Sequence, residues 1–474
     1  MKYLFCLLVL LSSLCPVLAE DDASMLYLKN CSACHGLNMQ GGNAQSLLDG
    51  QWLFAKDRTA ILRAIRDGIV MLGMPAHNNL STSQIGELAD LILQKEKEHK
   101  DFPLKAELPP KSLLKTVQTS DYNLKVQQWV TGLKMPWAIC FPDPVTVLIT
   151  ERPGKLRIVI NGKLDPRPIA NTPQVWAQGQ GGLLDVNIDP DYAQNKWVYL
   201  SYSHKIKPKG KTLGMTRIVR GKIVDHQWTD QQVLFEAPHQ FYSPTKHHYG
   251  SRIVFPPDGY LYFSTGDRGY QNQAQDITRP NGKIHRINRD GSIPKDNPFI
   301  NTPNAIPSIF TFGNRNPQGL SVHPVTGKVW GAEHGPKGGD ELNLIQKAGN
   351  YGWPEVTFGV NYNGTPITSF TTMKGMIDPV IHWTPSIAVC GIAFYNGSLF
   401  PQWANHLIVA SLKDQDVRIV KMTDDKVTNQ EIIIQKMGRV RDVGVSLDGA
   451  IYIVTNNPDR VLRLIPGTQQ QSVD

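Results

Sequence analysis

The amino-acid sequence predicts an all-β six-bladed β-propeller preceded by a small all-α domain. Two observations predict the propeller. After about residue 125 the chain alternates β-branched and aromatic residues with turn residues, and one turn-then-strand phrase recurs there six times. A third observation, three helical patterns within the first hundred residues, predicts the all-α domain. The chain has 474 residues, 41% of them hydrophobic, which is enough for two separate cores.

Residues 1–19 are typical of a secretory signal peptide. An apolar run from Leu4 to Leu14 is followed by a small-residue cleavage pattern that ends at Ala19. Cys15 leaves a lipoprotein signal as an alternative, although a leucine precedes it where a small residue is needed. No later segment approaches about eighteen consecutive apolar residues. We therefore expect a periplasmic or secreted protein with no transmembrane segment in the mature chain.

Three helical patterns precede residue 100. The first, 24–30, runs into Cys31, and the second, 57–68, starts with an aspartate and ends with a glycine. The third, 81–100, opens with Ser81 and Gln84 at capping-box spacing and carries one apolar stripe.

A haem attachment motif lies directly after the first helical pattern. Cys31, Cys34 and His35 spell C-x-x-C-H, and Met74 lies on a later loop where its sulfur could be the second axial ligand of the iron. Met71 is the alternative sulfur. A thioredoxin-like redox pair would not need the histidine. With the helix order, these residues make 22–98 similar to a class I cytochrome c domain carrying haem c.

A linker and a repeat follow this domain. Residues 99–124 are rich in charge and proline and are predicted to be a connector. The recurring phrases start at successive intervals of 47, 67, 67, 72 and 51 residues. Units of that size are typical of four-stranded blades, so a six-bladed propeller is predicted over 125–466, with a tail at 467–474. A pair of β-sandwiches is the alternative. The phrases start at Phe141, Ile188, Phe255, Val322, Phe394 and Val445.

Composition excludes some classes of partner. The formal net charge is +8, and the basic residues form no dense blocks with interleaved aromatics, so we expect no nucleic-acid partner. Cys140 and Cys390 remain after the signal and haem cysteines are assigned. They are either a disulfide of an exported protein or two buried thiols.

Several polar residues precede or follow predicted strands. His247 and His248 come just before a strand, and Asp267 follows the next one; a simple surface histidine pair is the alternative. The turn Gly335-Pro336 offers exposed carbonyls of the kind that bind calcium, although an ordinary blade-connecting loop has the same composition.

Arg439 and Arg441 are two residues apart on a predicted strand, so both side chains are expected on one face. Such a pair is unfavourable unless an anion lies between the guanidinium groups. Lys413 adds another cation from a neighbouring blade. A multiply charged anion in the central channel would satisfy all three, and a solvent-facing strand edge is the alternative.

Five phrases in a fixed order make the C-terminal domain resemble the soluble PQQ-dependent sugar dehydrogenases, which include glucose, aldose and sorbosone dehydrogenases. The phrases are "GQGGLLDV", "HHYGSRIVF", "GNRNPQGL", "EHGPKGGDELN" and "GRVRDV". The form "EHGP" is most similar to the aldose dehydrogenase branch. The resemblance implies a pyrroloquinoline quinone (PQQ) cofactor, calcium and the oxidation of aldose sugars to lactones.

The resemblance also implies roles for individual residues. His248 would be the general base and Gln180 would lie beside the reacting centre. Gly335 and Pro336 would bind, through their backbone oxygens, the calcium that also ligates PQQ, and Glu341 and Tyr351 match positions that bind structural calcium. The side chains that would hold PQQ are Arg315, Asn316, His334, Ser386, Lys413, Arg439 and Arg441.

Some positions depart from the family pattern. His247 stands where the glucose enzymes carry aspartate, and His334 stands where they have glutamine. Val389 and Cys390 replace a common Pro-Ser pair, which affects the expected PQQ contact near Ser386.

The sequence thus predicts an exported quinohaemoprotein that oxidises aldoses by hydride transfer to PQQ. Electrons would pass to haem c and then to a respiratory acceptor, either a cytochrome or the quinone pool. The alternative is a non-catalytic propeller that binds a glycan or a protein and carries a cytochrome as an electron shuttle. An eight-bladed alcohol dehydrogenase is a further option, but the repeats are too few.

Overall fold

The computed structural model describes residues 20–35, 39, 44, 46–48, 57–69, 74–101 and 112–467. The chain divides into two compact units, residues 1–103 (unit 1) and 104–474 (unit 2). The expected signal peptide, the expected tail beyond residue 467 and Met71 lie outside the described residues. Among the residues that are described, no helix is long and apolar enough to cross a membrane.

The described part of unit 1 contains helices at the three places where the sequence predicts them. The side chain of Asp57 caps α3 by accepting a hydrogen bond from the Ala60 amide at 2.7 Å. The capping box at the start of α4 forms, because Ser81 Oγ accepts from the Gln84 amide at 3.2 Å and Gln84 Oε1 accepts from the Ser81 amide at 3.0 Å. The helices are α1 (Glu20–Asn30), α2 (Ser32–His35), α3 (Arg58–Asp67) and α4 (Thr82–Asp101).

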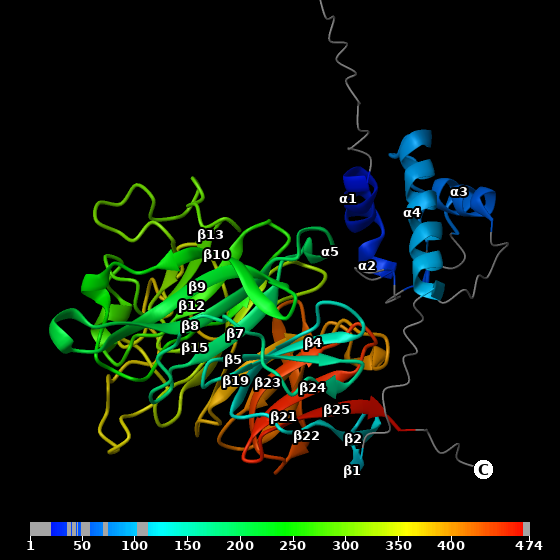
Figure 1. Ribbon diagram of the computed structural model, residues 1–474. Coiled ribbons are helices and arrows are strands. Elements are labelled where there is room, and N and C mark those ends of the chain that lie inside the picture. The colour runs from blue at the N-terminus through cyan, green and yellow to red at the C-terminus, as the bar shows by residue number, and fades with distance from the viewer. Residues whose placement is uncertain are drawn as a thin grey trace, which may run out of the picture. The chain divides into compact units, whose positions relative to one another are not determined.

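Unit 2 is a six-bladed β-propeller, as the sequence predicts (Figure 1). Five blades are four-stranded antiparallel sheets whose strands follow one another in the chain. The first strand of every blade lines the centre, because residues of all six line one cavity of about 200 Å³. These central strands are β3 (Pro136–Cys140), β7 (Leu183–Ile188), β11 (Ile253–Val254), β15 (Pro317–Val322), β19 (Val389–Phe394) and β23 (Arg439–Val445).

The second strand of each blade comes from one of the six recurring phrases, so the repeat in the sequence marks the blades correctly. These strands are β4 (Thr146–Glu151), β8 (Val198–Ile206), β12 (Leu261–Thr265), β16 (Val329–Glu333), β20 (Leu407–Ser411) and β24 (Ile451–Asn456). The third strands are β5 (Lys155–Ile160), β9 (Leu213–Val224), β13 (Lys283–Ile287), β17 (Asp340–Leu344), β21 (Asp416–Thr423) and β25 (Arg460–Pro466). The outer strands of the first five blades are β6 (Lys163–Leu164), β10 (Gln227–Glu236), β14 (Ile309–Phe312), β18 (Ile381–Trp383) and β22 (Lys426–Gln435). Short helical turns in the connections are α5 (Tyr192–Asn195), η2 (Pro208–Gly210), η3 (His239–Phe241), η4 (Gln271–Ala274) and η5 (Pro401–Trp403).

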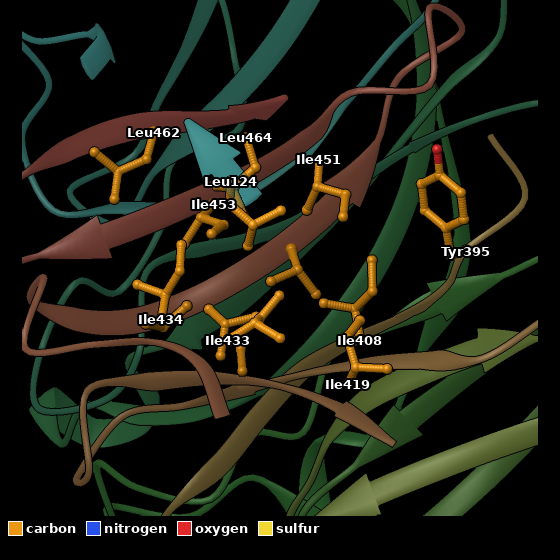
Figure 2. Close-up of a cluster of buried hydrophobic side chains, with 14 of the residues drawn as sticks. Leu124, Tyr395, Ile408, Ile419, Ile433, Ile434, Ile451, Ile453, Leu462 and Leu464 are labelled. Atoms are coloured by element: carbon orange, nitrogen blue, oxygen red, sulfur yellow. The ribbon is translucent and has the colours of Figure 1, made fainter. Parts of the chain in front are cut away.

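The sixth blade closes the ring with strands from both ends of unit 2. Its order is β1-β2-β25-β24-β23, so β2 (Asn123–Val130) and β1 (Ser112–Gln118) complete a blade that begins near the C-terminus. Leu124 of β2 is fully buried against Leu462 and Leu464 of β25, in the apolar cluster that Figure 2 shows. The range expected for the linker, 99–124, therefore contains the end of α4 and all of β1.

Candidate active site

The side chains that the sequence singles out in unit 2 lie at one end of the central strands. Gln180 precedes β7, His248 precedes β11 and Asn316 precedes β15. Because neighbouring strands are antiparallel, the loops after the second strands reach the same end, and these loops carry His334 and Lys413. We call this end of the propeller the hub face.

A histidine and a buried aspartate form the centre of the hub face. His248 Nδ1 donates to Asp267 Oδ1 at 2.7 Å, and Asp267 also accepts from the Gly269 amide at 2.7 Å and from Trp353 Nε1 at 2.9 Å. The carboxylate therefore fixes the imidazole ring and leaves Nε2 as the nitrogen that can accept a proton. Burial lowers the pKa of His248, and the hydrogen bond to Asp267 opposes that shift. The ring is consequently neutral near neutral pH, as a base must be.

Gln180 and Asn316 hold the loop that carries His248. Gln180 Oε1 accepts from the His248 amide at 2.8 Å, and Asn316 Oδ1 accepts from the Gly250 amide at 3.0 Å. Both amide side chains thus act on the backbone on either side of the imidazole.

The hub face also carries an excess of positive charge. Burial and then the charge of Arg441 lower the pKa values of Arg152 and Arg439, and burial followed by the charges of Arg441 and Arg315 holds the pKa of His334 well below its ordinary value. Among the described residues, none of these four arginines forms an ion pair within 4.0 Å. Cations gathered at one place without a carboxylate between them form a site for an anion.

Buried nitrogen atoms without a hydrogen-bond partner among the described residues occur on the hub face. They include His334 Nε2 and Arg441 Nε. Buried polar groups are nearly always paired in folded proteins. Unpaired donors beside an excess of positive charge are consistent with a ligand that supplies acceptor atoms.

The Gly335-Pro336 turn and the Ser386 loop are joined by a residue that the sequence did not single out. Asp340 accepts from the Gly335 amide at 2.9 Å, from Ser386 Oγ at 2.8 Å and from the Val389 amide at 3.1 Å. Lys413 Nζ donates to the Ser386 carbonyl at 2.8 Å. The Ser386 hydroxyl is therefore directed at Asp340, while the carbonyl of its loop is held by Lys413.

The turn itself requires glycine at its first position. A Cβ on Gly335 would lie 2.2 Å from the Gly338 carbonyl oxygen, which no other residue allows. The Gly335 carbonyl accepts from Arg315 Nη1 at 2.8 Å, and the same nitrogen donates to the His334 carbonyl at 3.0 Å. Arg315 thus orients the carbonyls of the turn expected to bind calcium.

Glu341 lies in a second group of oxygen atoms. Asn343 Nδ2 donates to Glu341 Oε2 at 3.1 Å and to Glu333 Oε1 at 3.4 Å, while Asn343 Oδ1 is buried without a partner among the described residues. Burial, and then the charge of Glu333, raises the pKa of Glu341 well above its usual value. Tyr351 uses its hydroxyl to donate to the Leu344 carbonyl at 2.6 Å, so only its backbone oxygen remains for a cation. In the described chain no cluster of three or more His, Cys, Asp or Glu side chains could hold a metal ion, so such sites would depend on backbone oxygens.

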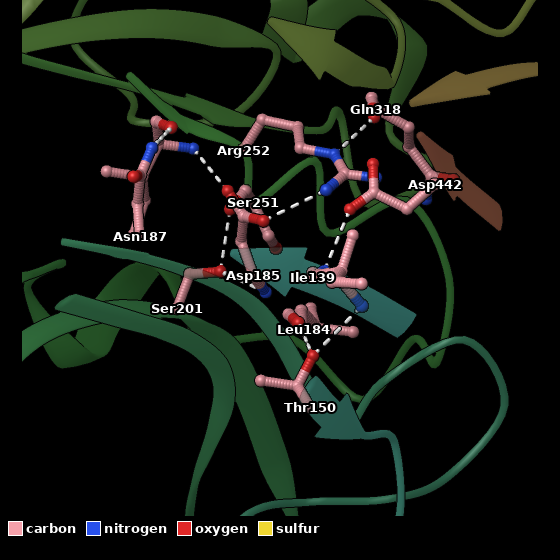
Figure 3. Close-up of polar contacts among 12 residues, drawn as sticks. Ile139, Thr150, Leu184, Asp185, Asn187, Ser201, Ser251, Arg252, Gln318 and Asp442 are labelled. Carbon is pink, nitrogen blue, oxygen red and sulfur yellow. Dashed lines mark hydrogen bonds and ion pairs between the residues drawn. The ribbon is translucent and has the colours of Figure 1, made fainter. Parts of the chain in front are cut away.

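Below the hub face, three charged side chains line the central cavity; we call them the channel floor. Arg252 pairs with Asp185 at 2.9 Å and with Asp442 at 2.8 Å, and all three are buried (Figure 3). Arg252 also donates to the Gln318 carbonyl at 2.8 Å and to the Arg441 carbonyl at 3.2 Å. The cation of the floor is therefore paired with carboxylates inside the protein, with one acidic group in excess, and Arg252 supports the backbone of Arg441.

Arg439 and Arg441 differ from their expected arrangement on a regular strand. The register of β23 against β24 shifts between Val440 and Asp442, so Arg441 lies in a β-bulge. Its Nη1 donates to Gln318 Oε1 at 3.0 Å, and Cys390 Sγ lies 3.5 Å from that nitrogen. Arg439 is exposed and Arg441 half-buried. Cys390, like Cys140, is a buried thiol and forms no disulfide.

In unit 1, the residues expected around a haem lie on or beside one apolar core. Cys31 is buried in that core and Met74 packs against it, while Cys34 is exposed and His35 ends α2. The Cys31 carbonyl accepts from the Cys34 and His35 amides at 3.2 and 2.9 Å, so the motif forms a tight helical turn.

Comparisons with known proteins match both units. Residues 133–463 match the family described as "Glucose / Sorbosone dehydrogenase", and residues 19–92 match the family described as "Cytochrome C oxidase, cbb3-type, subunit III". The aldose sugar dehydrogenase YliI of Escherichia coli K12 is 42% identical over 340 residues, which are 70% of this chain and 90% of the relative. The quinoprotein glucose dehydrogenase B of Acinetobacter calcoaceticus is 29% identical over 418 residues, 70% of this chain and 85% of the relative.

Solved structures agree with these matches. The soluble aldose sugar dehydrogenase of Escherichia coli, in its apo form, superimposes with a TM-score of 0.68 at 37% identity, covering 72% of this chain and 100% of the other. The PQQ-bound aldose sugar dehydrogenase of Streptomyces coelicolor gives a TM-score of 0.57 at 27% identity, covering 72% and 98%.

Proposed function

This chain belongs to the glucose/sorbosone dehydrogenase family and carries a cytochrome c-type domain, and from both we propose that it oxidises the C1 hydroxyl of aldose sugars to lactones with PQQ as oxidant. Haem c, held by Cys31, Cys34, His35 and Met74 in unit 1, would supply the one-electron acceptor that connects the site to a respiratory acceptor. The protein acts after export, in the periplasm or outside the cell. The observation that carries the proposal is the excess of unpaired cations beside a neutral histidine on the hub face.

The residues of the hub face suit PQQ, which is a planar quinone with three carboxylates. Arg315, Arg439, Arg441 and Lys413 offer cations, and the unpaired nitrogens of His334 and Arg441 offer hydrogen bonds. Oxygen-donating carbonyls of the Gly335-Pro336 turn suit calcium, which acts as a Lewis acid on a quinone carbonyl. Bound PQQ would supply the electrophile that accepts hydride from C1 of the sugar.

The side chains of this chain supply the proton transfer and the alignment. His248 Nε2 takes the proton of the C1 hydroxyl, because Nδ1 is already bonded to Asp267. Asp267 stabilises the imidazolium that forms, as a buried carboxylate does in a catalytic triad. Gln180 fixes the backbone amide of His248, so its side chain would lie beside the reacting centre.

The residues of the haem attachment motif in unit 1 can be assigned roles in the same way. Cys31 and Cys34 would hold the haem covalently, and His35 and Met74 would be its axial ligands. A haem held there accepts one electron at a time, which suits a two-electron quinone as donor.

The test is a reconstitution of the full-length haemoprotein with PQQ and calcium. We expect an aldose to reduce the haem iron, which the haem absorption bands report, and to bleach an added dye. We expect neither signal when PQQ is omitted. His248→Asn should lower turnover by about 10²–10⁴-fold while PQQ still binds. Binding of a glycan without uptake of PQQ would instead support a non-catalytic propeller.

A further inference from the structure

Arg268 is a fully buried cation that the reaction proposed above does not use. It follows Asp267 directly, it has no exposed surface, and the ion pairs of the described residues include none for it. The carboxylate of Asp267 is already bonded to His248, Gly269 and Trp353. Burying a cation without a carboxylate partner is costly, so proteins rarely keep one without a reason.

Arg252 in the channel floor shows the usual solution to the same problem. It is also buried and lies 4.2 Å from the Trp137 ring centre, but two aspartates neutralise it. Arg268 lies 3.5 Å from the Tyr249 ring centre and donates from Nη1 and Nη2 to two backbone carbonyls, while its Nε is buried without a partner among the described residues. The residues that carry these two carbonyls therefore indicate what Arg268 does in the fold.

Both carbonyls belong to the loop that carries His248. Arg268 Nη1 donates to the His247 carbonyl and Nη2 to the Thr245 carbonyl, while Tyr249 stacks under the guanidinium plane. The planar guanidinium group thus contacts Thr245, His247 and Tyr249, which alternate along the loop. The last two are the neighbours of His248 in the chain. Only arginine offers a flat fork that can hold two carbonyls and stack at the same time.

The backbone at this point needs to be held. His248 has a φ of 55° and Ser251 a φ of 98°, which are left-handed conformations that residues with a Cβ seldom adopt. The peptide between His247 and His248 is fixed on both sides, since Arg268 binds its carbonyl and Gln180 Oε1 accepts from its N–H at 2.8 Å.

We propose that Arg268 is a positioning residue, which fixes the His247–His248 peptide so that Asp267 can orient the imidazole and Nε2 is presented to the sugar hydroxyl. This inference rests on the proposed function for its kinetic consequence, but its structural consequence is independent of catalysis. Arg268 acts through the loop and touches neither sugar nor cofactor.

Two variants test the proposal against a matched control. Arg268→Lys keeps the charge but not the fork, and Arg268→Met keeps the volume alone. The control is Arg220→Lys. Arg220 also donates to a backbone carbonyl, that of Arg289 at 2.9 Å, and lies 4.4 Å from the Trp197 ring centre. It belongs to another blade and does not contact the loop that carries His248.

In the reconstituted full-length enzyme we expect kcat of both Arg268 variants to fall at least tenfold, with less loss in the lysine variant. KM for the sugar and the Kd for PQQ should stay within about threefold of wild type, and Arg220→Lys should change none of these values. The deuterium isotope effect on kcat with a C1-deuterated aldose should rise, because a misplaced base slows the chemical step. A folded Arg268→Met variant with kcat within threefold of wild type would overturn the proposal, as would a loss of activity that saturating PQQ restores.

A measurement without sugar separates this proposal from the proposed function. In nitrogen-15 histidine spectra of the apoprotein, assigned with His248→Asn, we expect a slowly exchanging His248 Nδ1–H in wild type and a faster exchange in Arg268→Lys. If the wild-type enzyme oxidised no aldose but this exchange difference appeared, the positioning role would stand and the proposed function would fail. Equal exchange in the two proteins would overturn the positioning role.

Discussion

Two charged regions follow one another along the axis of the propeller, and they differ in how their charges are balanced. In the channel floor, Arg252 pairs with Asp185 and Asp442 inside the protein (Figure 3). On the hub face, Arg439 and Arg441 have no carboxylate within ion-pair distance among the described residues, and burial and then the charge of Arg441 lower the pKa of Arg439. The charges of the floor are paired within the protein, whereas the cations of the hub face remain available to bind an anion.

The difference shows how a rigid scaffold prepares a binding site. The floor contributes the fixed part, because Arg252 holds the carbonyl of Arg441, and Gln318 links the two arginines through its own carbonyl and its side chain. The hub face then offers cations already in place, so that little conformational entropy is lost when the anion binds.

The largest expected effect comes from breaking the floor. Arg252→Met leaves two buried carboxylates without their cation and should lower the free energy of unfolding of the apoprotein by about 3–5 kcal/mol. Chemical denaturation of the apoprotein measures this change. Combining it with Asp185→Leu and Asp442→Leu should recover much of the loss, and a single variant as stable as wild type would show that the floor is not balanced as described.

The next largest expected effect comes from removing the hydrogen-bond partner of His248, the proposed general base. Asp267→Asn removes the carboxylate that orients His248 and should lower kcat by about 10²-fold. Because the hydrogen bond to Asp267 raises the pKa of His248 against the effect of burial, its loss should move the acid limb of the kcat/KM profile to lower pH. A limb that moves to higher pH would contradict this account of the site.

On the hub face, removing a cation should affect binding and not folding. Arg441→Met should weaken PQQ binding by about 10–100-fold, the contribution of a charge-assisted hydrogen bond, while the apoprotein stays as stable as wild type because a repulsion is relieved. Fluorescence titration with PQQ and denaturation of the same sample measure both. If Arg441→Met destabilised the apoprotein as much as Arg252→Met, the contrast between the two regions would be wrong.

The smallest effect is a pH dependence of stability that comes from the floor. Burial raises the pKa of Asp185 to about 6 even though Arg252 opposes the shift. The folded state therefore binds a proton that the unfolded state releases, between the ordinary aspartate pKa near 4 and about 6. Across that window stability should fall as pH rises, and Asp185→Asn should flatten the dependence in a series of denaturation curves. A wild-type stability that rose relative to the variant would contradict the assignment.

The sequence predicts the six blades well, because each recurring phrase is a turn followed by the second strand of a blade. The hub residues of unit 2 come mainly from the family resemblance, and the structure brings them together because the loops before the first strands and after the second strands meet at one end. The closing strand β1 escapes notice because it lies at a blade edge, with polar residues and prolines around it. Asp340, Gln318 and Arg268 escape because their partners come from distant loops, and no local pattern records which carbonyl or hydroxyl they will meet. The bulge at Arg441 likewise depends on pairing with β24 and not on alternation along β23.

The most direct test of the account is a crystal structure of the full-length protein grown with PQQ and calcium. We expect the carboxylates of PQQ to lie against Arg439, Arg441 and Lys413, with the quinone beside His248 Nε2 and the channel floor unchanged. Guanidinium groups turned toward solvent around an empty hub would contradict it.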